Sequence, residues 1–76
     1  MSQELIAMLA EVAGTSAEDI RGGFRLGDDL NMSAAEVDAV IVLIEDEMGI
    51  SVSDYDAEEM LDMTVREFCN TVLAED

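Results

Sequence analysis

The 76-residue sequence contains no histidine and a single cysteine, Cys69. An intramolecular disulfide needs two cysteines, so none can form. Without histidine the chain lacks the commonest general base and the commonest metal ligand, and it has no Ser–His or Cys–His pair for nucleophilic attack. One thiol without histidine also cannot build a zinc site. We therefore expect no metal centre, no catalytic residues and no enzymatic activity.

Positive charge is also scarce, because the sequence has three arginines, no lysine and 19 acidic residues, which give a formal net charge of −16. Nucleic acid and anionic membranes would be repelled by such a protein. A basic protein surface would be attracted, in a fast encounter that salt weakens. The acids could instead serve only solubility, although so large a charge destabilises a small fold through self-repulsion. The composition thus favours a basic protein as partner.

Long apolar runs are absent, and no stretch approaches the roughly 18 residues of a transmembrane helix. The first residues, MSQELIAMLAEVAG, lack the basic segment that opens a signal peptide. Half of the residues are hydrophobic, unlike an acidic disordered tail. We expect one folded domain over residues 1–76, monomeric and cytoplasmic, without membrane insertion.

Proline is absent as well, and apolar residues recur at helical spacing in place of strand-like alternation. The first expected helix covers residues 3–13 and ends at Gly14, a residue type that favours helix ends. A short capped turn over 16–20 and a long loop over 22–32 follow. Three apolar side chains are expected to anchor that loop: Phe24, Leu26 and Leu30.

The second expected helix opens with a capping box, in which Ser33 is the N-cap and Glu36 the third helical residue. It should run to Met48 and stop at Gly49. Its middle, residues 40–44, is apolar throughout and could also form a buried strand, but the capping box and the length favour helix. A helix that is apolar all round is either central or docks a partner on its outer side.

A short third helix is expected over Asp54–Leu61, and a last helix after a second capping box formed by Thr64 and Glu67. Cys69 lies in the apolar stripe of the last helix, and no lysine or histidine is present to lower its pKa. It is therefore interpreted as a core residue, with a reactive thiol as the alternative. The predicted fold class is all-α, a small irregular four-helix bundle with three longer helices, one short helix and a long first loop.

Residues 29–40 and 45–50, DLNMSAAEVDAV and EDEMGI, resemble the acyl carrier protein family. The family pattern is D-L-G-x-D-S-L-D-x-V-E-L, then an apolar stretch, E-E-E-F and an isoleucine-containing linker. The resemblance implies a four-helix carrier domain with a 4′-phosphopantetheine arm on a serine at the start of the second helix. The arm's thiol would hold an acyl group as a thioester. The implied partners are a phosphopantetheinyl transferase and basic acyl-processing enzymes of fatty acid, polyketide or lipid biosynthesis.

The sequence departs from the family at the D-S-L motif, and two alignments are possible. Without gaps, Ala34 falls on the modified serine and Ser33 on the preceding aspartate, the helix N-cap. With a loop one residue shorter, and one extra residue before Glu45, Ser33 becomes the modified serine. Ser33 is thus either the attachment residue or a structural cap. If Ala34 is the true equivalent, the chain is a non-modifiable, carrier-like acidic interaction or regulatory module.

The resemblance also implies that acids of the second helix dock onto basic patches of the partner enzymes. Their alternative role is a solvated helix face. The candidate docking residues are Glu36, Asp38, Glu45, Asp46 and Glu47.

Overall fold

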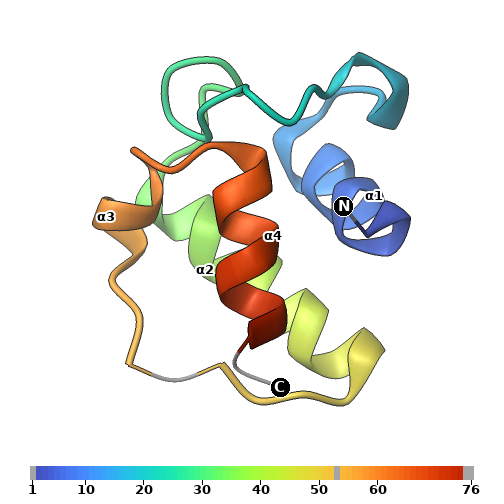
Figure 1. The fold of residues 1–76 in the computed structure, drawn as a ribbon, viewed down its shortest axis with the longest axis vertical. Coiled ribbons are helices and arrows are strands. Elements are labelled where there is room, and N and C mark those ends of the chain that lie inside the picture. The colour runs from blue at the N-terminus through green and yellow to red at the C-terminus, as the bar shows by residue number, and fades with distance from the viewer. Residues whose placement is uncertain (1, 53, 75–76) are drawn as a thin grey trace.

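The fold is all-α over the residues that the computed structural model describes, 2–52 and 54–74, as predicted (Figure 1). There are three longer helices and one short one, and a 3-10 turn followed by the long first loop connects the first two helices. The elements are α1 (Gln3–Ala13), η1 (Ala17–Asp19), α2 (Ala34–Met48), α3 (Ala57–Met60) and α4 (Val65–Ala74).

Helix α1 has the predicted bounds because both of its ends are satisfied locally. The Ser2 hydroxyl accepts a hydrogen bond of 3.3 Å from the Leu5 amide at the N-terminus. At the C-terminus, Gly14 adopts a left-handed conformation with φ 76°, and its amide donates to the Ala10 carbonyl. A residue without a Cβ takes this conformation at little cost, so the helix ends there.

Helix α2 begins with the predicted capping box. The Glu36 amide donates to the Ser33 hydroxyl at 3.2 Å, and the Ser33 amide donates to the Glu36 carboxylate at 2.9 Å. The helix ends at Gly49, which has φ 67°. The apolar run 40–44 is therefore helical, and only part of it is buried: Val40, Ile41 and Ile44 are buried, Leu43 is half-buried and Val42 is 62% exposed.

Helix α4 begins with the second predicted capping box, in which Thr64 and Glu67 exchange hydrogen bonds of 2.9 and 3.1 Å. Its apolar stripe packs into the core with no exposed surface, as predicted for Val65, Phe68, Cys69 and Val72. Every buried side chain in the described part of the chain is apolar. Helix α2 contacts α1 on one side and α3 on the other, so these elements share one core.

Helix α3 is shorter than predicted, because it begins at Ala57 rather than Asp54. Asp54 has a positive φ of 57°, which a right-handed helix cannot include. The Asp56 carboxylate accepts hydrogen bonds from the amides of Glu58 and Glu59 and thereby caps the helix. The prediction of its N-terminal bound was therefore wrong by three residues.

The long first loop lies against the chain between α3 and α4, over one end of the helices (Figure 1). The Leu26 amide donates to the Met63 carbonyl at 3.1 Å, and the Val65 amide donates to the Phe24 carbonyl at 2.7 Å. Leu26 is fully buried, while the other two predicted anchors, Phe24 and Leu30, are half-buried. These contacts fix the path of the loop to the start of α2.

Candidate functional site

Ser33 lies at the junction of the long loop and α2, and its side chain is exposed. Its hydroxyl already acts as the helix cap, because it accepts the Glu36 amide hydrogen bond. Ala34 is the first residue of α2 and is half-buried. The N-cap position is the one that the ungapped alignment assigns to Ser33. Both candidate positions therefore sit at the N-terminal end of α2, and Ser33 has a structural role there.

The five candidate docking acids do not form one face of α2. Successive residues of a helix are turned by about 100°, so their side chains spread around the axis. Glu36 takes part in the capping box. The Glu45 carboxylate accepts a hydrogen bond of 2.8 Å from the Val52 amide, and Asp38 accepts one of 2.8 Å from the Tyr55 hydroxyl. Three of the five carboxylates thus hold neighbouring parts of the protein in place.

The exposed side of α2 combines two of the predicted acids with small and apolar residues. Their spacing of three or four residues places them on one stripe, and each of them is exposed. We name this stripe the outer face of α2; it consists of Ala35, Asp38, Ala39, Val42 and Asp46. Among the described residues, Val42 and Leu73 are the large hydrophobic side chains that remain exposed, and Val42 is the more exposed of the two. Sequence reasoning did not select Val42, although a helix with an all-apolar middle must expose one such residue.

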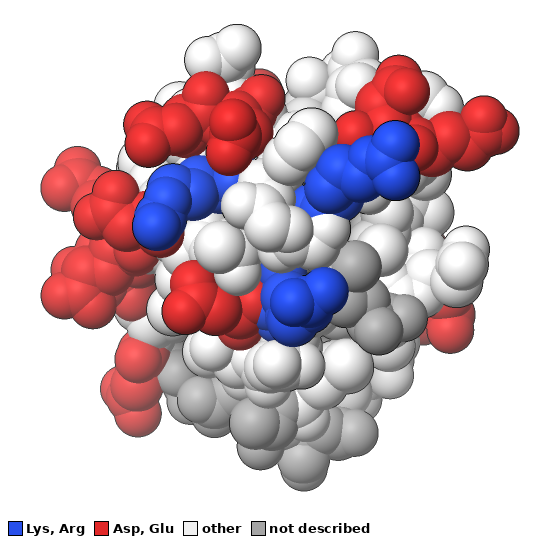
Figure 2. All heavy atoms as spheres, turned by 45° about the horizontal axis from the view of Figure 1, so that its top comes forward, with Lys and Arg blue, Asp and Glu red and all other residues white. Residues whose placement is uncertain are grey.

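The arginines belong to other elements than α2. Figure 2 shows all three on one side of the molecule, with acids around them. They come from the segment between η1 and α2 and from the start of α4: Arg21, Arg25 and Arg66. The Arg25 guanidinium donates to the Asp62 carbonyl, which ties it to the chain after α3. None of the three is on α2, so the sequence places no cation on its outer face.

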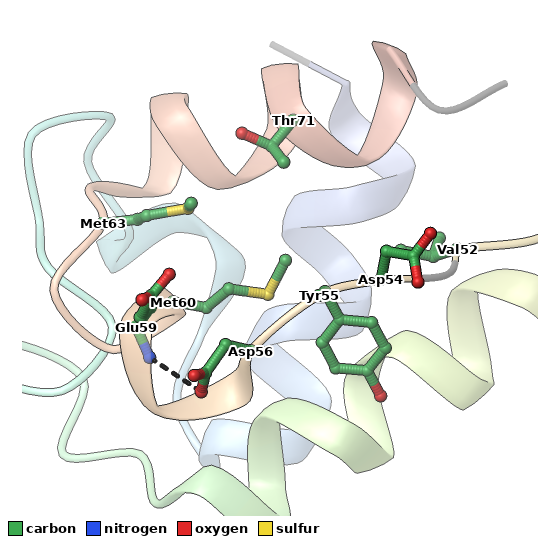
Figure 3. A pocket seen from close by; sticks show the side chains of 8 residues that line it. All are labelled: Val52, Asp54, Tyr55, Asp56, Glu59, Met60, Met63 and Thr71. Atoms are coloured by element: carbon green, nitrogen blue, oxygen red, sulfur yellow. Dashed lines mark hydrogen bonds between the residues drawn. The ribbon is translucent and has the colours of Figure 1, made fainter.

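A small pocket of about 130 Å³ opens between residues 52 and 54–56, α3 and α4 (Figure 3). The sulfur-containing side chains of Met60 and Met63 point toward its interior, and Thr71 faces it from α4. Acidic residues stand at its edge. The complete lining is Val52, Asp54, Tyr55, Asp56, Glu59, Met60, Met63 and Thr71. The pocket therefore has an apolar floor and an acidic rim.

Cys69 lies in the core of the bundle, and burial raises the pKa of its thiol. This environment matches the predicted core role, since a reactive thiol needs a lowered pKa. Over residues 2–52 and 54–74, no group of three or more acidic, histidine or cysteine side chains is arranged to hold a metal ion. Within the same residues, no helix is both long and apolar enough to cross a bilayer.

When the chain is compared with known protein families, curated proteins and solved structures, nothing matches. The likeness to acyl carrier proteins thus rests on the sequence motifs around Ser33 and on their order along the chain.

Proposed function

We propose that this chain is an acyl-carrier-like protein that basic enzymes bind through the outer face of α2. In this proposal it carries an acyl group as a thioester on a 4′-phosphopantetheine arm attached to Ser33. One observation carries the proposal: an exposed serine hydroxyl begins the same helix that presents an exposed valine between two acids. Attachment residue and docking surface are then next to each other, as a carrier requires.

The surroundings of Ser33 are compatible with a phosphodiester. The N-terminus of a helix carries partial positive charge and amides that favour an anion. The side chain is exposed, so an arm has room to leave the surface. Attachment would compete with the cap, because the Ser33 oxygen now accepts from the Glu36 amide and the Glu36 carboxylate is held close by. The arm, when bound, would supply the thiol that the protein itself does not expose.

The pocket of Figure 3 offers a place for the apolar end of a short carried group. Its floor contains Met60 and Met63, and methionine side chains adapt to guests of different shape. A volume of about 130 Å³ suits a small group rather than a long chain. The pocket thus supports the carrier proposal for short acyl groups.

A second candidate function is an acidic docking module with the same outer face and no arm. It is favoured by the capping role of Ser33 together with Ala34 in the first helical position. In the ungapped alignment Ala34 replaces the serine that would be modified. Such a protein would bind an enzyme's carrier site without delivering a substrate.

Intact mass after incubation with coenzyme A and a broad-specificity phosphopantetheinyl transferase separates the two functions. A gain of one arm on the wild-type chain, abolished in Ser33→Ala, would support the carrier. A gain that persists in Ser33→Ala would exclude Ser33 as the attachment residue. No gain on the folded wild-type chain would exclude the carrier. If Ala34→Ser then gained the arm, the transferase would recognise the fold and only the serine would be missing.

The docking surface is tested separately by the affinity of the unmodified chain for a basic transferase at several salt concentrations. We expect binding to weaken as salt rises, because exposed charges are screened. The double variant Asp38→Asn/Asp46→Asn should weaken it further. Glu18→Gln/Asp19→Asn is the matched control, since it removes the same charge from η1, outside helix α2. Equal losses in both double variants would argue against the outer face of α2.

A further inference from the structure

A groove of about 220 Å³ lies between α1 and the C-terminal half of α2. Ala7, Met8 and Glu11 line it from α1, and Leu43 and Glu47 line it from α2. Met8 and Leu43 are half-buried, so they form an apolar floor, whereas both glutamates are exposed. The groove therefore has a hydrophobic base and one carboxylate on each of its two helices.

This combination is suited to a long cationic side chain. Arginine and lysine both have apolar stems that cover hydrophobic surface while the charged end stays near water. The planar guanidinium has five N–H donors and can bond carboxylates on different sides, whereas an ammonium is a compact point charge. The two walls of the groove each carry one carboxylate, Glu11 on α1 and Glu47 on α2. An arginine side chain therefore fits the groove better than a lysine side chain does.

No arginine of the chain lines this groove. The three positively charged side chains come from positions 21, 25 and 66. A cation that enters would reduce the repulsion between Glu11 and Glu47 and the other acids of a chain with a net charge of −16. The electrostatic complement of the groove is therefore a basic residue of another molecule.

We infer that this groove receives an arginine side chain of the basic protein that binds α2. Glu47 follows Asp46 of the outer face directly, so a partner seated on that face has the groove within reach. The identity of the partner rests on the proposed function, whereas the chemistry of the groove does not. The groove extends the docking surface from α2 onto α1.

N-butylguanidinium is the probe, because it carries the guanidinium group of arginine on an apolar stem of similar length. The measurement is the methyl NMR signals of Met8 and Leu43 during titration at constant ionic strength. We expect saturable shifts at both methyl groups. Three controls should bind more weakly: guanidinium lacks the stem, N-butylurea lacks the charge, and butylammonium has the head group of lysine.

The variant Glu11→Gln/Glu47→Gln should weaken binding of N-butylguanidinium roughly three- to tenfold, since each exposed ion pair contributes modestly. Glu18→Gln/Asp19→Asn removes equal charge from η1 and should leave binding unchanged. The role of the carboxylates would be overturned if Glu11→Gln/Glu47→Gln bound N-butylguanidinium as tightly as the wild type does. It would also be overturned if N-butylurea bound the wild type as tightly as N-butylguanidinium does. Tighter binding of butylammonium would overturn the choice of arginine. Absence of saturable shifts would exclude the site, and the transferase experiments would still decide the proposed function on their own.

Discussion

The hydroxyl of Tyr55 donates a hydrogen bond of 2.8 Å to Oδ1 of Asp38 and so joins the segment before α3 to helix α2. Tyr55 lines the pocket of Figure 3, and Asp38 belongs to the outer face of α2. A basic partner residue that bound Asp38 would compete with Tyr55 for the same carboxylate. The bond therefore connects the proposed docking surface with the wall of the pocket.

The hydrogen bond to Asp38 raises the pKa of Tyr55, and burial and the charges of Asp38 and Glu45 raise it further by smaller amounts. The phenol should titrate above its ordinary pKa of about 10. The contribution of this hydrogen bond to the stability of the fold is therefore present below the ordinary pKa of tyrosine. It is lost as the pH rises through the pKa of Tyr55 in the folded protein. Ultraviolet absorbance reports it cleanly, since the chain has one tyrosine and no tryptophan.

Asp38→Asn should return the pKa of Tyr55 toward its ordinary value. Asp46→Asn is the matched control, because it removes the same charge from α2 without touching the bond. Identical titration curves for the two variants would show that the bond does not govern the tyrosine.

Ser33→Ala should lower the free energy of unfolding of the unmodified protein by about 1 kcal/mol, because it removes a helix cap. Ser33→Asp should lose little, since aspartate caps equally well and its charge suits a helix N-terminus. Urea unfolding of the three proteins measures the difference. If Ser33→Ala had the same free energy of unfolding as the wild type, the capping hydrogen bond would contribute nothing to stability. Modification of the serine would then carry no cost in stability.

The parts of the fold that the sequence predicted are those fixed by local interactions. The capping pairs Ser33–Glu36 and Thr64–Glu67 are only three residues apart, and Gly14 and Gly49 end their helices through their own backbone conformation. Such signals do not depend on the rest of the chain. The bounds of α1 and α2 and the start of α4 were accordingly predicted to the residue.

The parts that were missed have two causes. The start of α3 is a local feature that the helical spacing did not reveal: Asp54 has a left-handed conformation, and Asp56 caps the helix. The other missed features depend on contacts between distant segments. Glu45 and Asp38 are drawn to Val52 and Tyr55, partners that helical spacing alone cannot reveal. The groove between α1 and α2 likewise exists only once the helices pack. Helical spacing therefore could not show that Glu36, Asp38 and Glu45 hold neighbouring parts of the protein, and the docking role of the acids of α2 stays a prediction.

Cys69 should react slowly with a thiol reagent in the native protein, because it is fully buried and burial raises the pKa of its thiol. Its reaction then requires local or global opening, so denaturant should accelerate it by on the order of a hundredfold or more. Absorbance of the released thiolate follows the rate with and without urea. Similar rates in both conditions would identify a reactive thiol and contradict the core assignment.

Glu67 should make the stability of α4 depend on pH. The Thr64 amide donates to its carboxylate and lowers its pKa, helped by the Thr64 hydroxyl and the charge of Arg25. A lowered pKa means that the stabilisation is present above the unfolded value of about 4.3 and is lost as the pH falls through the folded pKa. The difference in unfolding free energy between wild type and Glu67→Gln should therefore shrink in acid. A difference independent of pH would contradict this role of the carboxylate.

Two valines of α2 provide a matched test of core against docking surface. Val40 has no exposed surface, whereas Val42 is 62% exposed on the outer face. Val40→Ala should lower the free energy of unfolding by about 2 kcal/mol, because it removes buried methyl groups and leaves a cavity. Val42→Ala should change stability by less than about 0.5 kcal/mol, as surface substitutions usually do.

The same pair should behave in the opposite way in binding. If a basic enzyme covers the outer face of α2, Val42→Ala should weaken the affinity of that enzyme for the unmodified chain several-fold. Val40→Ala should leave the affinity unchanged at temperatures where the variant is folded. Titration calorimetry with the transferase used in the mass experiment measures both. Wild-type affinity in Val42→Ala would exclude the exposed valine as a contact, because a side chain covered by a partner loses buried apolar area when it is shortened. The acids of α2 would then bind without an apolar anchor.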